Sequence, residues 1–306
     1  MWRARTLDDD QTMTADTAAR RSSAPRPQAS GKRPLFRRRS AIPGFGLTMG
    51  VTLTVLSLIV LIPLSAVVLK AAHQSPAEFW AVATSQRSMA AYRLSFGAAF
   101  VAAVINGVFG VLTAWALVRY DFPGKTIVNA LVDLPFALPT AVAGIALATL
   151  YSPNGWVGQF LTPLGIKAAY NPIGVTIALI FIGLPFVVRT IEPVLRDAAE
   201  DVEEAAASLG ANRIDTILRI VLPALAPAWL TGFAMAFARG VGEYGSVIFI
   251  AGNMPYKSEI APLLIIIQLE QFEYARAATI AVVMLTVSFT MLFVINAIQA
   301  WARRFD

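Results

Sequence analysis

Two oppositely charged residues, Arg239 and Glu243, lie four positions apart inside the apolar stretch Leu225–Ala251. In a helix this spacing places both side chains on one face, where a guanidinium and a carboxylate can pair. Charged groups in an apolar segment are costly unless they pair or line a polar path. These two residues, together with the neighbouring Tyr244, are therefore the first candidates for a function.

Enzymatic chemistry has few candidate residues in this chain. The sequence has no cysteine and one histidine, His73, which excludes thiolate chemistry and nearly excludes a histidine-based site. The segment FPGKT (Phe122–Thr126) ends like a nucleotide-binding loop, but Arg119 stands where that loop needs its first glycine. We therefore expect a tight turn at Pro123-Gly124, no catalytic residue, and no metal or cofactor bound by this chain.

The composition predicts an integral membrane protein. Hydrophobic residues make up 57% of the chain and charged residues only 14%, whereas soluble domains carry about 25% charged residues. A span needs roughly 20 apolar residues of helix, and open strands cannot leave backbone groups unpaired in lipid. We predict an all-α fold with six spans: Leu47–Leu69, Leu94–Val118, Ile127–Tyr151, Ala168–Val188, Leu225–Ala251 and Ala277–Ala302. The run Ile260–Leu269 is too short to cross.

The distribution of lysine and arginine predicts the orientation of these spans. Eighteen of the 25 basic residues lie on the side that holds both termini, which places the two termini in the cytoplasm. Residues 1–46 are rich in Arg, Ser and Pro and are predicted to be a basic disordered tail, either inert or in contact with anionic lipid. Residues 47–306 then form one transmembrane domain.

A cytoplasmic loop at 190–223 interrupts the apolar pattern with EEAAASLGANRIDTILRIVLP (Glu203–Pro223). Alanine and glutamate favour a helix, Gly210 is placed to end it in a left-handed conformation, and Asn212 can cap the next helix. Ile214, Ile217, Leu218 and Val221 give that second helix an apolar stripe. Such a loop is either a lever for a partner protein or an ordinary connector that seals the bundle.

A resemblance to a known family separates these alternatives. The loop resembles the EAA loop of ABC-importer permeases, a coupling element that docks on a cytoplasmic ATPase, in Glu204, Ala205, Ala206, Gly210, Ile220, Val221, Leu222 and Pro223. The resemblance implies a six-helix type I importer permease that does not itself hydrolyse ATP. A separate ATPase chain would use ATP and Mg.

From about Ala41 onward the sequence resembles the T-type permease of sulfate/thiosulfate importers. The matching segments are IPGFGLTMG (42–50), LPFALPTAVAG (134–144), PFVVRT (185–190) and GEYGSVIFIAGNMPYKSEIAPL (242–263). The resemblance implies a bacterial inner-membrane complex with a second permease subunit, an ATPase dimer and a periplasmic sulfate- or thiosulfate-binding protein, and no nucleic acid. Alternatives are a molybdate or tungstate permease and, from other classes, an ion-coupled secondary transporter or a membrane-embedded enzyme.

A sulfate path would need positive potential inside the bundle. Arg239 is predicted near or just past mid-membrane, lining that path while Glu243 weakens its hold on the anion; the alternative is an ion pair that holds helices together. Asp133 is predicted to pack helices, and Pro135 and Pro139 to kink the third span. Alternating access, with the coupling helices (residues 200–212) drawn together by ATP binding, is the expected mechanism.

Overall fold

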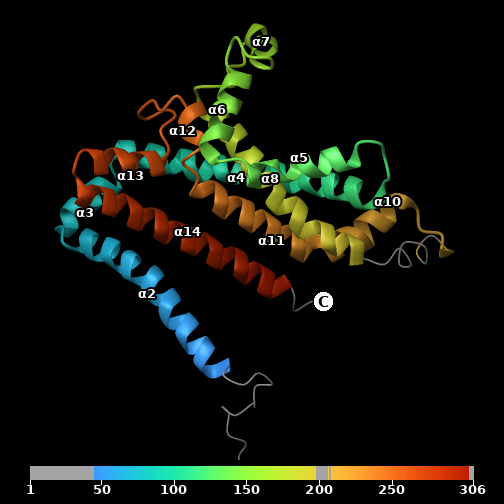
Figure 1. The fold of residues 1–306 in the computed structure, drawn as a ribbon, viewed down its shortest axis with the longest axis horizontal. Helices are drawn as coiled ribbons and strands as arrows, with labels where there is room; N and C mark the ends of the chain where they lie inside the picture. Colours follow the sequence, from blue (N-terminus) through green and yellow to red (C-terminus); the bar gives the residue numbers. More distant parts are fainter. Residues whose placement is uncertain (1–44, 198–205, 207, 303–306) are drawn as a thin grey trace, which may run out of the picture. The chain divides into compact units, whose positions relative to one another are not determined.

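The computed structural model describes residues 45–197, 206 and 208–302, and every regular element in those ranges is a helix (Figure 1). The chain divides into two compact units, Met1–Leu56 and Ser57–Asp306, and the contacts described below lie within the second. The predicted basic tail falls almost entirely outside the described residues. In chain order the helices are α2 (Phe45–Ala72), α3 (Pro76–Ala83), α4 (Gln86–Arg119), α5 (Lys125–Ala137), α6 (Thr140–Tyr151), α7 (Gly158–Leu161), η1 (Thr162–Leu164), α8 (Pro172–Asp197), α10 (Arg213–Thr216), the π-helix η2 (Ile217–Val221), α11 (Leu222–Val241), α12 (Val247–Ile250), α13 (Ala261–Glu270) and α14 (Tyr274–Ala302).

Five helical runs of the described chain are long and apolar enough to cross a membrane: α2, α4, α8, the run Ile214–Val241, and α14. The pair α5–α6 makes a sixth crossing if it is counted as one broken span. The predicted all-α membrane class is confirmed. Helix α13 has only 10 residues, in agreement with the expectation that Ile260–Leu269 is too short to cross.

The third predicted span is not one kinked helix. Helices α5 and α6 meet at an angle of 118°, and Figure 1 shows α6 turning away from α5. The break lies at Leu138 and Pro139, whereas Pro135 stays inside α5. Leu138 is extended with ψ 136°, because the ring of a following proline disfavours the helical region. Pro139 has no N–H to continue the α5 hydrogen-bond ladder, so the helix ends there.

Two further span boundaries differ from the prediction. Helix α8 begins at Pro172, because Asn171 Oδ1 accepts hydrogen bonds from the N–H groups of Ile173 and Gly174 at 2.8 and 3.2 Å. Proline at the first helical position loses no hydrogen bond, which suits it to this start. The helix then continues to Asp197, so the first residues of the predicted loop 190–223 extend the fourth span.

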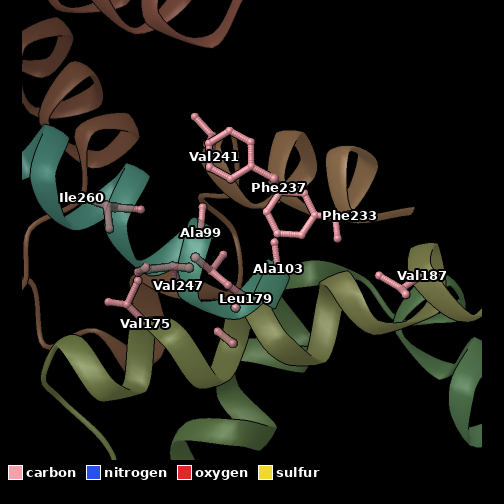
Figure 2. Close-up of a cluster of buried hydrophobic side chains, with 14 of the residues drawn as sticks. Ala99, Ala103, Val175, Leu179, Val187, Phe233, Phe237, Val241, Val247 and Ile260 are labelled. Atoms are coloured by element: carbon pink, nitrogen blue, oxygen red, sulfur yellow. The ribbon is translucent and has the colours of Figure 1, made fainter. Parts of the chain in front are cut away.

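Helices α4, α8 and α11 pack against one another through small residues. Val187 of α8 is fully buried. A Cβ added at Gly110 of α4 would lie 2.6 Å from Val187 Cγ1, and one added at Gly232 of α11 would lie 3.0 Å from Val187 Cα. Figure 2 shows side chains of all three helices in this cluster, among them Ala103 and Phe237. Small residues at helix contacts allow the close van der Waals packing that holds membrane helices together.

Candidate functional site

The structure joins Arg239 and Glu243 in an ion pair, as their spacing predicts, but Glu243 is not in the helix. Helix α11 ends at Val241, and Glu243 lies in the turn that follows, so the predicted fifth span to Ala251 is too long. Glu243 Oε2 accepts from Arg239 Nη1, and Glu243 Oε1 accepts from both the N–H and the hydroxyl of Ser246, each at 2.9 Å. The carboxylate therefore links the end of α11 to the start of α12.

The two charged side chains differ in how much of their surface is exposed. The Glu243 side chain is 2% exposed, whereas the Arg239 side chain is 35% exposed. Tyr244 is half-buried and packs against the core. Arg239 and Glu243 are thus brought together, with Tyr244 beside Glu243 in the chain, and the arginine is the more exposed member of the ion pair.

The turn that carries Glu243 packs tightly on α6. A Cβ added at Gly144 of α6 would lie 2.3 Å from the carbonyl oxygen of Ser246, and one added at Gly245 would lie 2.2 Å from Thr140 Oγ1. The Ser246 contact is with backbone, which cannot move aside as a side chain can. Because both positions are glycine, the turn that carries Glu243 can lie in close contact with α6.

Arg239 lies in the last turn of α11, close to the end of that helix. A Cβ on the next residue, Gly240, would lie 3.3 Å from Ala99 Cβ and 3.9 Å from Leu179 Cδ1. Ala99 is about 20 Å from the Gln86 end of α4 and about 30 Å from its Arg119 end, at 1.5 Å per residue. The pair therefore packs about 5 Å from the midpoint of α4, on the Gln86 side of it.

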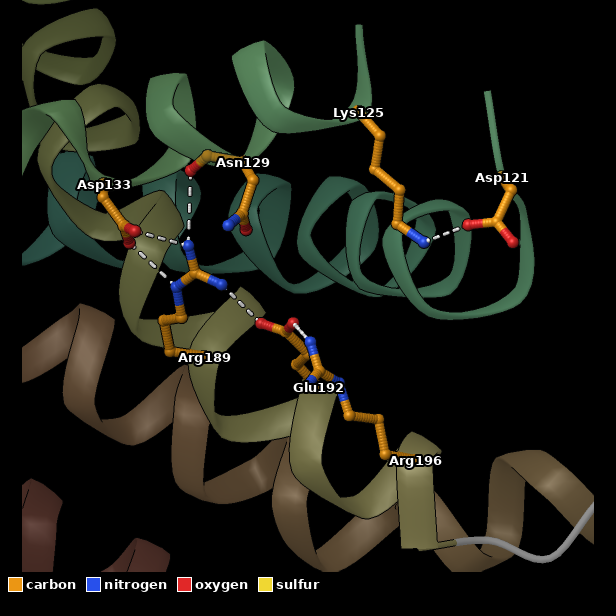
Figure 3. Close-up of polar contacts among 7 residues, drawn as sticks. All are labelled: Asp121, Lys125, Asn129, Asp133, Arg189, Glu192 and Arg196. Atoms are coloured by element: carbon orange, nitrogen blue, oxygen red, sulfur yellow. Dashed lines mark hydrogen bonds and ion pairs between the residues drawn. The ribbon is translucent and has the colours of Figure 1, made fainter. Parts of the chain in front are cut away.

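A second charged cluster joins α5 to α8 (Figure 3). Arg189 Nε and Nη2 donate to the two oxygens of Asp133 at 2.8 and 2.6 Å, and Nη1 donates to Glu192 at 2.5 Å. Arg196 donates to the other oxygen of Glu192 at 2.5 Å. The helix-packing interpretation of Asp133 agrees with this geometry, because its carboxylate ties two helices together.

The partner of Asp133 was missed by sequence reasoning, which placed Arg189 in a loop. A signal was available: a carboxylate in an apolar span needs a cation in reach. Arg189 in PFVVRT follows the apolar run directly. Only the extension of α8 to Asp197 places it inside a helix that faces α5.

The predicted coupling loop at 190–223, called the coupling segment below, is described in part. Glu204 and Ala205 lie outside the described residues. Ala206 is buried, and Gly210 has φ +86°, which confirms the predicted left-handed end of the first helix. The N–H of Ala211 donates to the carbonyl of Ala206 at 3.0 Å, the bond that closes a helix end around a left-handed residue.

The second half of the coupling segment continues directly into the membrane helix. Asn212 Oδ1 accepts from the N–H of Asp215 at 2.8 Å, which confirms the predicted N-cap. From Arg213 the chain is helical through Ile220, Leu222 and Pro223 to Val241, so Pro223 lies inside one helical run and not at a boundary between the predicted loop 190–223 and the fifth span. The π-turn Ile217–Val221 lies just before this proline, where the wider turn accommodates a residue that lacks an N–H.

The predicted apolar stripe on this segment is mostly open. Val221 is buried, but Ile214 is 68% exposed and Leu218 56% exposed. Leu209, just before Gly210, is 88% exposed. Apolar side chains gathered on an exposed segment mark a surface suited to a partner.

The segment FPGKT forms the predicted tight turn. Gly124 has φ +91°, and the N–H of Lys125 donates to the carbonyl of Phe122 at 3.2 Å. Lys125 Nζ bonds Asp121 at 2.8 Å, and this ammonium lowers the pKa of the Asp121 carboxyl. The lysine thus starts α5 and pairs locally.

A family model decides which group of proteins this arrangement belongs to. The model of the binding-protein-dependent transport system inner membrane component matches residues 106–304, which include both charged clusters and the coupling segment. The chain belongs to this family. This inner membrane component is therefore a multi-pass subunit of an ABC importer.

Curated relatives of this inner membrane component extend the match over most of its length. It is 49% identical over 262 residues to the "Sulfate transport system permease protein CysT" of Salmonella typhimurium, covering 86% of this chain and 95% of the relative. It is 51% identical over 251 residues to the protein of the same name from Synechococcus elongatus, covering 82% and 90%.

Solved structures share its fold. One chain of a bacterial ABC transporter involved in the import of the acidic polysaccharide alginate matches with a TM-score of 0.68 at 17% identity, covering 84% of this chain and 96% of that chain. A chain of the MetNI methionine ABC transporter in an inward facing conformation matches with a TM-score of 0.55 at 15% identity, covering 75% and 99%. These likenesses confirm the predicted type I importer permease fold.

Proposed function

We propose that this chain is the transmembrane permease subunit of an ATP-driven sulfate importer that also accepts thiosulfate. The observation that carries the proposal is the 49% identity to a sulfate transport permease over 95% of that relative's length. The match to this relative covers 86% of the chain, and the family model covers residues 106–304. The relatives are named for sulfate, which favours sulfate over molybdate or tungstate.

The proposed complex contains three kinds of partner. A homologous second permease would complete the anion pathway, an ATPase dimer would bind ATP and Mg in the cytoplasm, and a periplasmic binding protein would deliver sulfate or thiosulfate. This chain would lie in a bacterial inner membrane with both termini in the cytoplasm. This chain would form part of the anion pathway, and the ATPase would hydrolyse ATP.

The coupling segment supports an ATPase contact. Ile214 and Leu218 present exposed apolar side chains, which a groove on the ATPase would cover. The same helix continues to Val241, a length of roughly 40 Å at 1.5 Å per residue. Because the segment and the membrane helix are one rod, movement of the ATPase would reach Arg239 directly.

The Arg239–Glu243 pair supports an anion path with weak retention. A dianion needs positive potential inside the membrane, and the 35% exposed Arg239 side chain supplies it. The buried carboxylate of Glu243 cancels part of that charge, so that sulfate would pass without being trapped. High affinity can then reside in the periplasmic protein.

The test is uptake of labelled sulfate in a bacterial strain that lacks its own T-type permease, with and without this chain. We expect restored uptake that unlabelled thiosulfate blocks and molybdate does not. Uptake blocked by molybdate would contradict the proposed substrate.

The variant Gly210→Arg tests the lever in the same assay. No atom lies within 4 Å of a Cβ at this position, but φ +86° strains any side chain there. We expect loss of uptake with unchanged protein in the membrane. Uptake at the wild-type rate would exclude a coupling role for this turn.

A further inference from the structure

A groove of about 400 Å³ lies between the end of α2, helix α13 and the start of α14. It belongs to the unit Ser57–Asp306 and takes no part in the charged clusters or the coupling segment. Its wall is made by Ala66, Val67, Lys70, Ile265, Leu269, Tyr274, Ala277, Ala278 and Ala281. A volume of this size falls in the range of ligand sites, about 300–1,000 Å³.

The wall of the groove is apolar and regular. Ile265 and Leu269 come from consecutive turns of α13, and Ala277 and Ala281 from consecutive turns of α14. Residues four apart share a helix face, so each of these two helices turns one face toward the groove. The alanines leave the room that larger side chains would fill. The result is an apolar groove, which suits a hydrocarbon chain.

One end of the groove is polar. Lys70 lies in the last turn of α2, and Tyr274 is the first residue of α14. Lys70 is exposed, and in the described part of the chain no carboxylate lies within 4.0 Å of its ammonium; Glu273, which precedes Tyr274 in the chain, is 3.9 Å from Arg276. Tyrosine and lysine at helix ends are the residues that membrane proteins place at the level of lipid headgroups.

We propose that this groove binds a membrane phospholipid, with one acyl chain between α2, α13 and α14 and its anionic headgroup paired with Lys70. The apolar wall matches the acyl chain, and the lone ammonium at the rim matches a phosphate. The predicted topology puts the site in the outer leaflet. The lipid would brace α2 against α14 beside the hydrogen bonds from Gln74 Nε2 to Ala275 O and Thr279 Oγ1, at 2.8 and 2.7 Å.

The test uses phosphatidylglycerol with a photoreactive acyl chain, added in limiting amount to the full importer complex in zwitterionic nanodiscs. Cross-linked peptides are mapped by mass spectrometry. We expect labelling in the peptides that contain Ile265–Leu269 and Tyr274–Ala281. The variant Lys70→Ala should reduce it roughly fivefold, the effect of one lysine near an anionic headgroup. Lys70→Arg should retain it.

Two controls separate this site from general lipid contact. Lys167→Ala removes an exposed lysine on the same predicted side and should leave labelling unchanged. Ala281→Phe fills the groove and should reduce labelling while Lys70 is kept. Equal labelling by a phosphatidylcholine probe, or by the Lys70→Ala variant, would overturn the proposal. Labelling in the isolated chain that disappears in the complex would also overturn it, because a subunit would then cover the groove.

Discussion

Three donors converge on the carboxylate of Glu243: the Arg239 guanidinium, and the N–H and hydroxyl of Ser246. Such a carboxylate stabilises the turn after α11 whatever else it does, since a buried charge must be paired and hydrogen-bonded. Arg239 is different because much of its surface is open. The two members of one pair can therefore have different roles, structural for Glu243 and functional for Arg239.

Replacement of Arg239 by glutamine tests this division. We expect sulfate uptake to fall at least about tenfold, the loss of one charge-assisted hydrogen bond to the passing anion, with complex assembly unchanged. Uptake per assembled complex, with the ATPase co-purified, measures both quantities. Arg276→Gln is the matched control, because that arginine is exposed and 3.9 Å from its partner. Loss of assembly in Arg239→Gln would favour the structural interpretation.

The arginines of the second cluster are unequal. Arg189 bonds carboxylates on α5 and α8, whereas the partner of Arg196 among the described residues is Glu192, and the Arg196 side chain is 65% exposed. We expect Arg189→Met to cost about 1–3 kcal/mol, because the link to Asp133 on α5 is lost together with one donor to buried Glu192. Arg196→Met should cost at most about 1 kcal/mol. Thermal unfolding midpoints in detergent compare the two, and equal midpoints would contradict this ranking.

At the scale of helices, close contact of α4, α8 and α11 depends on glycines that face Val187. The change Gly110→Ala places a Cβ 2.6 Å from Val187 Cγ1, and we expect overpacking to cost about 1–3 kcal/mol. Gly97→Ala makes the same change in the same helix, where no atom lies within 4 Å, and should stabilise by up to about 1 kcal/mol.

Unfolding midpoints of these two variants are the measurement. The double variant Gly110→Ala with Val187→Ala should regain part of the loss, since the two sites are in contact and their effects are not additive. If Gly97→Ala and Gly110→Ala had the same effect, helix propensity rather than packing would govern this position.

At the scale of the whole molecule, the predicted orientation can be tested directly because the chain has no cysteine. Single cysteines at Asp121, in the turn before α5, and at Gln159, in α7, lie on exposed positions. A membrane-impermeant maleimide added to intact spheroplasts should label Gln159→Cys and leave Asp121→Cys unlabelled until the membrane is permeabilised. The reverse pattern would invert the topology.

Much of the architecture follows from local sequence. Membrane spans, the caps at Gly210 and Asn212 and the turn at Gly124 were predicted because each depends on residues within a few positions of one another. The prediction for the third span was wrong in its geometry. Pro139 indicates that the helix is interrupted, but the angle of 118° between α5 and α6 depends on what α6 packs against, here the turn that contains Ser246. The continuous helix through Pro223 was missed because a π-turn has no strong local signal.

By itself, the sequence determined the class of this protein, most of its spans and the local turns of the predicted coupling segment, because apolar content and short motifs are local properties. Only the tertiary structure decided which charges meet. Asp133 and Arg189 are 56 positions apart, and their pairing required α5 and α8 to lie together. The same holds for the groove at Lys70, whose walls come from three helices. Contacts between distant segments depend on how helices pack, and packing is a property of all their surfaces at once.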